Sequence, residues 1–417
     1  MSTSESSHAT PAFTVGLNDS TLGLLIAAIL LYTAVLWTAN GPNVERTDFS
    51  LSYVGAKIVH TGTGEQLYNL ELQKKLRNSL FPRPVPLFFE HPPFEAWLLS
   101  PLAAHSFRAA YLLWGLLNAS VLLALIVALR PYLPWPREGL GYVFLWLLFA
   151  PLVVALYQGQ SSLLVLGSFV LAFLLLKRQQ DFPAGIALGF GLLKFQFALP
   201  FALIFVFRRK WQFLGGFALC AFVLMLISIS AIGWGGVLGY ARFLLAIGNN
   251  PKNVFFGSGV DMPTVHGFLF ALTGGRLSGV GLNVVATVLS IALLAWIALR
   301  WGRADASSFD LMFCAAVAAS LLSGSHMFTH DLSLLALPMF LLLGHLSWQE
   351  NQPSNLAPRL ALWFALLLFW MFPIYFLLVK WHCLYLMAPV LLVLVWGAIK
   401  ETQVVHVSAG AHVVAAR

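Results

Sequence analysis

An aspartate close to the first apolar segment has the setting best suited to catalysis. Asp48 lies shortly beyond the apolar run 21–38, at the depth where lipid headgroups meet hydrocarbon. Burial of an acidic residue beside a membrane is costly, so its presence there needs a reason. One reason is general-base catalysis, in which the carboxylate accepts the proton of a sugar hydroxyl that attacks an anomeric carbon. The alternative is that Asp48 caps a helix beginning at Phe49.

The leaving group decides whether one carboxylate is enough. A prenyl phosphate departs as a weak base and needs no general acid, whereas glycoside hydrolases use a pair of carboxyl groups. Glu90 and His91, where the polar stretch returns to the membrane, are candidates for orienting a sugar or binding a phosphate. An exposed loop pair is the alternative, and Pro92 and Pro93 are explained by an extended backbone and a helix entry alone.

Three further groups are candidates for binding an anion or a sugar. Lys194 lies deep inside an apolar segment, where an unpaired charge costs about 2.5–3.5 kcal/mol, so a phosphate or a helix carbonyl end is expected beside it. His326 and His330 are spaced to share one face if their segment is helical, which suits phosphate, sugar hydroxyls or ordinary loop polarity. No Glu completes a zinc motif there, and we expect no metal site. Arg242 either holds a phosphate or reaches toward headgroups.

The composition requires a membrane around these residues. Of 417 residues, 59% are hydrophobic and 10% are charged, whereas a soluble domain has about 25% charged residues. The apolar runs do not alternate in polarity as the strands of a membrane barrel do, so we expect an all-α polytopic protein. The net charge of +8 is scattered over segment ends with no basic stripe, which argues against a nucleic-acid partner.

The apolar runs divide one domain, 21–400, into about twelve transmembrane segments. The first run is expected to be a retained anchor after a disordered cytoplasmic tail at 1–20, and 401–417 a second cytoplasmic tail. A first outer loop spans 40–106, with a second semi-polar stretch at 232–279. The remaining apolar segments lie near 107–129, 139–157, 160–176, 183–207, 211–231, 280–300, 307–323, 331–346, 360–378 and 382–399.

Basic residues in short connections set the orientation. Four clusters alternate with connections that lack Lys and Arg, which places the clusters in the cytoplasm: Arg130 with Arg137, Lys177 with Arg178, Arg208 to Lys210, and Arg300 with Arg303. Two clusters flank 183–207, so we expect a hairpin of half-length helices with Lys194 near its tip rather than one crossing. The segment 91–104 is expected to be an interfacial or re-entrant helix. The basic residues of the first loop oppose this orientation, but long loops follow the charge rule less strictly.

Four stretches resemble bacterial glycosyltransferase family 87. The run TDFSLSYVGAKIVHTGTGEQLYN is similar to the family's Asp-Phe signature, and FFEHPPFEAWLLSPLAAHSFRAAYLLWGLLN to its Phe-x-Tyr-Pro-Pro segment. YQGQSSLLVL resembles its Gly-Gln-x-Asn-x-Leu element, which points to Gln160 as a substrate-binding residue, and FPAGIALGFGLLKFQFALP resembles its later Lys-containing segment. The departures are His91 in place of Tyr and a serine, Ser161 or Ser162, in place of Asn.

The resemblance implies a fold of the GT-C class with Asp48 as general base in the first extracytoplasmic loop. We therefore expect an inverting transferase that moves a hexose, such as mannose, from a polyprenyl phosphate to a lipid or glycan acceptor. It would act at the outer face of the plasma membrane, the bacterial inner membrane, without a cofactor. Cations such as Lys194, Arg242 or a histidine would stabilise the phosphate.

Other function classes remain open. A transporter or flippase for lipid-linked glycans usually has paired internal repeats with broken helices, and only 183–207 reads as broken here. A glycan ligase is closer in chemistry and would differ by using a diphosphate carrier. A membrane scaffold has no obvious use for a polar loop of about 50 residues that begins with an acidic motif.

Overall fold

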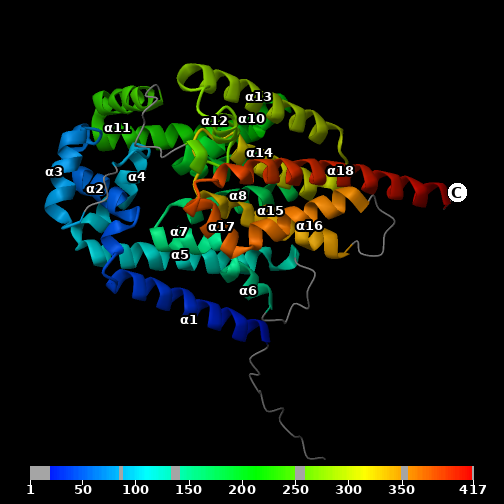
Figure 1. Ribbon diagram of the computed structural model, residues 1–417, viewed down its shortest axis with the longest axis horizontal. Helices are drawn as coiled ribbons and strands as arrows, with labels where there is room; N and C mark the ends of the chain where they lie inside the picture. Colours follow the sequence, from blue (N-terminus) through cyan, green and yellow to red (C-terminus); the bar gives the residue numbers. More distant parts are fainter. Residues whose placement is uncertain (1–18, 84–87, 133–140, 249–258, 349–355, 416–417) are drawn as a thin grey trace, which may run out of the picture.

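The computed structural model is helical throughout the residues that it describes, which are 19–83, 88–132, 141–248, 259–348 and 356–415 (Figure 1). Every regular element in these ranges is an α-helix or a short 3-10 helix, as the sequence predicts. The predicted N-terminal tail lies almost wholly outside the described residues. At the other end, α18 (Met387–Ala415) continues through most of the predicted C-terminal tail.

The first loop folds into short helices that gather at one end of the molecule, beyond the end of α1 (Asp19–Asn40) (Figure 1). The interfacial segment predicted at 91–104 is α4 together with η3, and both pack on α2. A small apolar core that includes Phe49, Tyr53 and Trp114 holds this loop on α5. The loop elements are η1 (Val44–Arg46), α2 (Phe49–His60), η2 (Gly64–Gln66), α3 (Leu70–Leu80), α4 (Pro93–Leu99) and η3 (Ser100–Ala104).

The remaining helices are mostly apolar and run between two ends of a bundle (Figure 1). In order they are α5 (Phe107–Leu129), α6 (Gly141–Leu148), α7 (Ala150–Gln158), α8 (Ser162–Lys177), α9 (Asp181–Gly189), α10 (Phe195–Phe207), α11 (Trp211–Gly248), α12 (Val265–Leu272), α13 (Gly279–Arg303), α14 (Phe309–Leu322), α15 (Ala336–Trp348), α16 (Leu356–Trp370), α17 (Phe372–Lys380) and α18. Short 3-10 helices join them, of which η5 (Phe190–Lys194) and η8 (Asp331–Leu335) carry residues of the candidate site.

Several of these helices are long and apolar enough to cross a bilayer, so the chain is a multi-pass membrane protein. Six stretches qualify in the described part of the chain, or seven if the pair α16–α17, bent by 70°, is one span. They are Thr21–Asn40, Phe107–Tyr132, Asp181–Phe207, Trp211–Ala246, Gly279–Arg303 and Leu384–Thr402. The predicted total of about twelve is larger because it also counts broken helices and apolar helices of fewer than 18 residues, such as α8 and α14.

The segment 181–210 is a hairpin, although its length and composition alone would suit one crossing. Asp181 Oδ2 lies 3.3 Å from Lys210 Nζ, and the Phe205 ring stacks on Phe213 with 3.9 Å between centroids. A straight helix would separate the first two residues by about 43 Å. The backbone leaves helical geometry at Lys194, with φ −125° and ψ 71°. The prediction of two half-length helices with Lys194 near the tip is confirmed.

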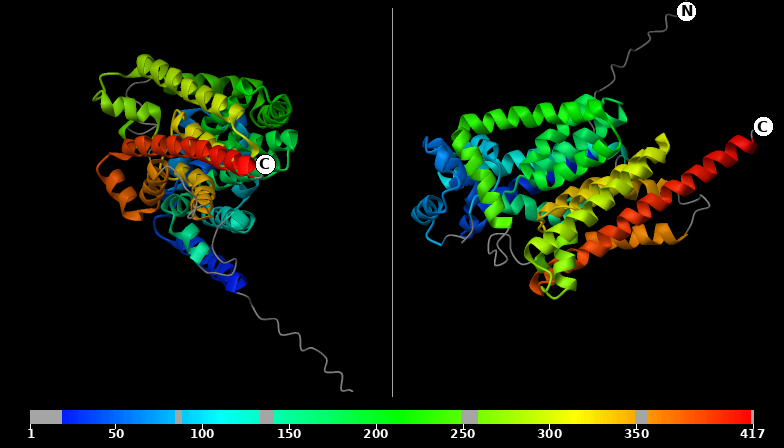
Figure 2. Two further views of the ribbon diagram at one scale, coloured as in Figure 1. Left: turned by 90° about the vertical axis from the view of Figure 1, so that its right-hand side faces the viewer. Right: turned by 90° about the horizontal axis from the view of Figure 1, so that it is seen from above.

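Small residues allow the hairpin to pack closely against its neighbours. A Cβ on Gly185 would overlap the carbonyl oxygen of Phe213 in α11, so these two backbones are in direct contact. Gly189 lies close to the Cys220 side chain and Gly191 close to the Ser168 hydroxyl, so all three glycines allow close helix packing. Further along, α11 bends at Gly233, where φ is +69°, and its second half packs against the first loop (Figure 2).

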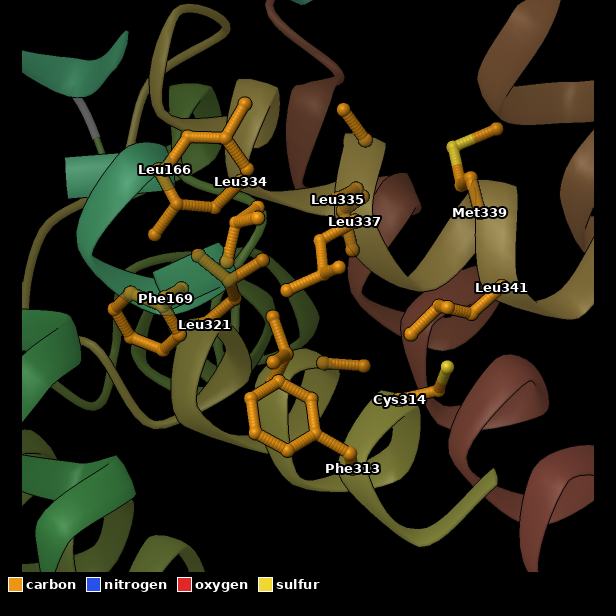
Figure 3. Close-up of a cluster of buried hydrophobic side chains, with 14 of the residues drawn as sticks. Leu166, Phe169, Phe313, Cys314, Leu321, Leu334, Leu335, Leu337, Met339 and Leu341 are labelled. Carbon is orange, nitrogen blue, oxygen red and sulfur yellow. The ribbon is translucent and has the colours of Figure 1, made fainter. Parts of the chain in front are cut away.

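A buried helix at the centre of the bundle carries the main core. Residues 311–322 of α14 are all buried, and they pack against α10, α13, α15 and α18. Figure 3 shows leucine and aromatic side chains meeting there, with Leu166 and Phe169 from α8 and Leu334 and Leu335 from η8. Because η8 and the first turn of α8 rest on this core, the polar residues at their beginnings have fixed positions.

The basic clusters meet at the end of the bundle opposite the first loop (Figure 1). Lys177 pairs with Asp310 at 2.8 Å and lies 4.9 Å from the Tyr132 ring, and Arg208 lies 4.3 Å from the Trp301 ring. The basic clusters lie at one end of the bundle, as the sequence predicts, except that Arg137 lies outside the described residues. The assignment of this side to the cytoplasm stays a prediction.

Candidate active site

Asp48 is hydrogen-bonded to a turn more than a hundred residues further along the chain. Its carboxylate Oδ2 accepts a hydrogen bond from Gln160 Nε2 at 2.7 Å, and its backbone N–H donates to Gln158 Oε1 at 3.0 Å. Although Asp48 directly precedes α2, its side chain makes no capping hydrogen bond, so the capping interpretation is wrong. The side chain is 26% exposed, which leaves the carboxylate open to a substrate.

A left-handed glycine positions both glutamines. Gly159 ends α7 with φ +64°, and a Cβ there would lie 2.8 Å from Cβ of Phe49, the first residue of α2. Its carbonyl accepts a hydrogen bond from Trp114 Nε1 at 2.8 Å. Only a residue without a side chain lets the turn approach α2 this closely, which is why the two glutamines on either side of it reach Asp48.

A buried ion pair fixes the orientation of the Gln160 amide. Lys194 Nζ donates to Asp331 Oδ1 at 2.5 Å and to Gln160 Oε1 at 3.0 Å, and both charged side chains are buried. Because the ammonium only donates, the oxygen of Gln160 faces Lys194 and its nitrogen faces Asp48. Ser162 Oγ adds a hydrogen bond to Asp331 at 3.3 Å. A continuous polar chain therefore runs from Asp331 to Asp48.

His330 completes this group. Its Nδ1 lies 3.6 Å from Asp48 Oδ2, and its Nε2 lies 3.4 Å from Asp331 Oδ1. The segment 323–330 is irregular, so the expected helical face with His326 does not form. Burial lowers the pKa of His326 to about 3, and it lowers the pKa of His330 despite the nearby carboxylates. We call Asp48, Gln160, Lys194, His330 and Asp331 the Asp48 cluster.

The end of the first loop lies beside the Asp48 cluster. Burial raises the pKa of Glu90 to about 7, against the opposing charges of His91 and Lys194. His91 Nδ1 lies 2.7 Å from Glu95 Oε1, which is buried in α4. The hydroxyl of Tyr68 donates to the carbonyl of His91 at 2.7 Å. Charges on His91 and on Lys194 also lower the pKa of His330.

Of the residues that the sequence singled out, four lie in the Asp48 cluster (Asp48, Gln160, Lys194 and His330), and the charges of Glu90, His91 and His326 interact with it. Arg242 is exposed on the second half of α11, and within the described residues it makes no hydrogen bond or ion pair with the Asp48 cluster. Sequence reasoning did not single out Gln158, Glu95 or Asp331 as site residues. A signal for Asp331 was present, because Lys194 in an apolar segment needs a carboxylate partner.

Comparison with known families shows which family this chain belongs to. The model of glycosyltransferase family 87 matches residues 88–324, more than half of the chain. The chain belongs to glycosyltransferase family 87. The match includes Glu90, His91, Gln160 and Lys194, whereas the Asp48 signature lies before its first residue. Searches of curated proteins and of solved structures gave no match.

The family gives the cluster of this family 87 glycosyltransferase a chemical context. Transfer of a sugar to an alcohol needs a group that accepts the alcohol's proton. Asp48 is a partly exposed carboxylate held by the side chain of Gln160 and accompanied by His330, whose pKa is lowered. A partly exposed carboxylate held in this way can accept the proton of a hydroxyl that reaches it.

Proposed function

We propose that this glycosyltransferase is an inverting hexosyltransferase that uses a polyprenyl-phosphate sugar as donor. The hexose, such as mannose, would pass to a lipid or glycan acceptor at the outer face of the bacterial plasma membrane. About twelve membrane segments, counting the hairpin as two and the short apolar helices as crossings, would enclose the lipid-facing site. The observation that carries the proposal is the open carboxylate of Asp48, held where the first loop meets the membrane bundle.

In the proposed reaction the acceptor hydroxyl oxygen attacks the anomeric carbon. Asp48 takes the hydroxyl proton, a new C–O bond forms, and the bond to the phosphate oxygen breaks with its electron pair on the phosphate. The configuration at the anomeric carbon inverts because a single displacement takes place. Gln160 orients the carboxylate, and the ion pair of Lys194 with Asp331 orients Gln160.

Substitution of Asp48 tests the proposal directly. Purified protein would be incubated with polyprenyl-phosphate mannose or glucose and membrane acceptors, and the products identified by mass spectrometry. Asp48→Asn keeps an oxygen for the Gln160 bond but removes the base. We expect turnover to fall about 10²- to 10⁴-fold, with donor binding retained.

The matched control is Glu71→Gln, which removes an exposed carboxylate of the same loop and should leave turnover unchanged. Equal turnover by the wild type and Asp48→Asn would exclude Asp48 as the base. Activity with diphosphate-linked glycans alone would instead identify a ligase.

A further inference from the structure

His91 and Glu95 form a pair that the reaction described above does not use. Their contact joins Nδ1 to Oε1 at 2.7 Å, one turn apart at the beginning of α4. Glu95 is 2% exposed, and its second oxygen has no hydrogen-bond partner among the described residues. A carboxylate buried with so little support favours a charged imidazole as its partner.

The backbone of this segment is held on both sides of His91. The Tyr68 hydroxyl donates to the carbonyl of His91, and the Tyr240 hydroxyl donates to the carbonyl of Glu90 at 3.3 Å. The two tyrosine rings stack with 4.6 Å between centroids. The His91 side chain is 21% exposed, and its Nδ1 is bound to Glu95. Nε2 is therefore the ring nitrogen left to donate to a ligand.

The chain on both sides of His91 packs on α2, the helix that begins directly after Asp48: α4 lies against α2, and a Cβ on Gly55 would lie 2.7 Å from the Phe89 ring. Burial lowers the pKa of His91, but the charge and hydrogen bond of Glu95 raise it by more, so the net pKa lies above the ordinary value. His91 interacts electrostatically with charged groups from three parts of the chain. They are Glu90 and Glu95 of its own segment, Lys194 of η5, and His326 and His330 before η8.

The other cation candidates are less suited to an incoming anion. Lys194 is buried, and Asp331 already balances its charge. Burial lowers the pKa of His326 and of His330, so both imidazoles are uncharged at neutral pH. Arg242 follows Tyr240 by two positions, about 200° around α11, and therefore faces away from the loop that Tyr240 contacts.

We propose that His91, held by Glu95, is the cation that binds the donor's phosphate; this assignment rests on the function proposed above. A sugar-bearing prenyl phosphate carries one negative charge, and the phosphate gains a second when the bond to the sugar breaks. The Nε2–H of the imidazolium donates a hydrogen bond to that phosphate and stabilises the added charge. No proton is transferred to the phosphate, and Glu95 acts as a positioning residue.

The binding of polyprenyl monophosphate, the reaction's lipid product, tests this role. Full-length protein in nanodiscs would be titrated with polyprenyl monophosphate between pH 6 and 9, with uncharged polyprenol as the reference lipid. Each variant is compared with the wild type at the same pH, so that the titration of the lipid itself cancels. The variants are Glu95→Gln, His91→Gln and the exposed control Glu71→Gln.

We expect Glu95→Gln to shift the loss of binding to lower pH, because burial then lowers the pKa of His91 without opposition. At pH 7.5 its affinity should be weaker by about tenfold or more. His91→Gln should bind polyprenyl monophosphate weakly at every pH, with no pH at which binding is half lost. Glu71→Gln should match the wild type. If Glu95→Gln does not fold, His91→Gln still decides the matter, because it leaves the buried face of α4 intact.

The two proposals fail in different ways. Wild-type protein that transfers sugar and binds the lipid, together with Glu95→Gln and His91→Gln variants whose binding follows the same pH profile, would overturn the role of His91 alone. Wild-type protein that neither binds polyprenyl monophosphate nor uses polyprenyl-phosphate sugars would overturn the proposed function itself.

Discussion

At the scale of single residues, one amide connects a membrane-buried charge to the candidate base. Gln160 accepts from Lys194 and donates to Asp48, so the ammonium influences the carboxylate without contacting it. The sequence predicted Asp48, Gln160, Lys194 and His330 as site residues, and the structure brings them together. It did not predict that they form one chain, because the link through Asp331 joins residues 137 positions apart and depends on tertiary packing.

Glu90 should make the stability of the folded protein depend on pH. Its pKa rises from 4.5 to about 7 in the folded protein, so the folded state keeps a proton that the unfolded chain releases between these values. Stability therefore falls as the pH increases from 4.5 to about 7, and the loss is complete above that range. Glu90→Gln removes this titration, and the variant should gain thermal stability relative to the wild type across the same interval. If the melting temperatures of Glu90→Gln and the wild type differ by the same amount at pH 5 and at pH 8, the raised pKa of Glu90 is contradicted.

At the scale of elements, the hairpin α9–α10 is the unit that carries Lys194 into the bundle. Its existence could be predicted because basic clusters flank an apolar stretch on both sides. The irregular course of 323–330 could not, because the spacing of two histidines indicates a shared face only after a helix is assumed. Gly324 and its serine neighbours interrupt the helix there, and His330 still reaches Asp48.

Loss of one partner of the ion pair between η5 and η8 should destabilise the protein more than loss of both. Lys194→Met leaves Asp331 buried without its partner, which should cost about 3–5 kcal/mol of unfolding free energy. The double variant Lys194→Met/Asp331→Leu removes both charges and should recover most of that loss, while activity stays low because Gln160 loses its orientation. Thermal unfolding in detergent and sugar transfer would be measured on the same samples. A double variant as unstable as Lys194→Met would show that the contact is not the cause.

At the scale of the whole molecule, the sequence predicted the helical membrane fold, and which helix ends lie together, better than it predicted the number of membrane spans. Runs of apolar residues indicate helices in lipid, and basic ends indicate which ends lie together. Whether a helix as short as α8 or α14 crosses the bilayer depends on its neighbours, since surrounding protein can replace lipid around a buried helix. Hydropathy alone therefore does not fix the count.

Labelling of single cysteines tests the orientation. In a variant without Cys220, Cys314 and Cys383, cysteine would replace exposed Thr63 in the first loop or exposed Gln179 at the opposite end. A membrane-impermeant maleimide should label the Thr63→Cys protein in intact cells and the Gln179→Cys protein only after permeabilisation. The reverse pattern would place the first loop in the cytoplasm and contradict the proposed outer-face reaction.

The separation of Lys194 and Asp331 along the chain has a consequence for biosynthesis. The lysine leaves the ribosome 137 residues before its carboxylate, an interval of about 7 to 27 s at usual rates of translation. During that time the tip of the hairpin holds an ammonium group without the carboxylate that balances it in the finished protein. We therefore expect the hairpin to reach its final depth late, once synthesis has passed residue 331 of 417. A nascent chain interrupted earlier would lack both the counter-charge and the complete Asp48 cluster.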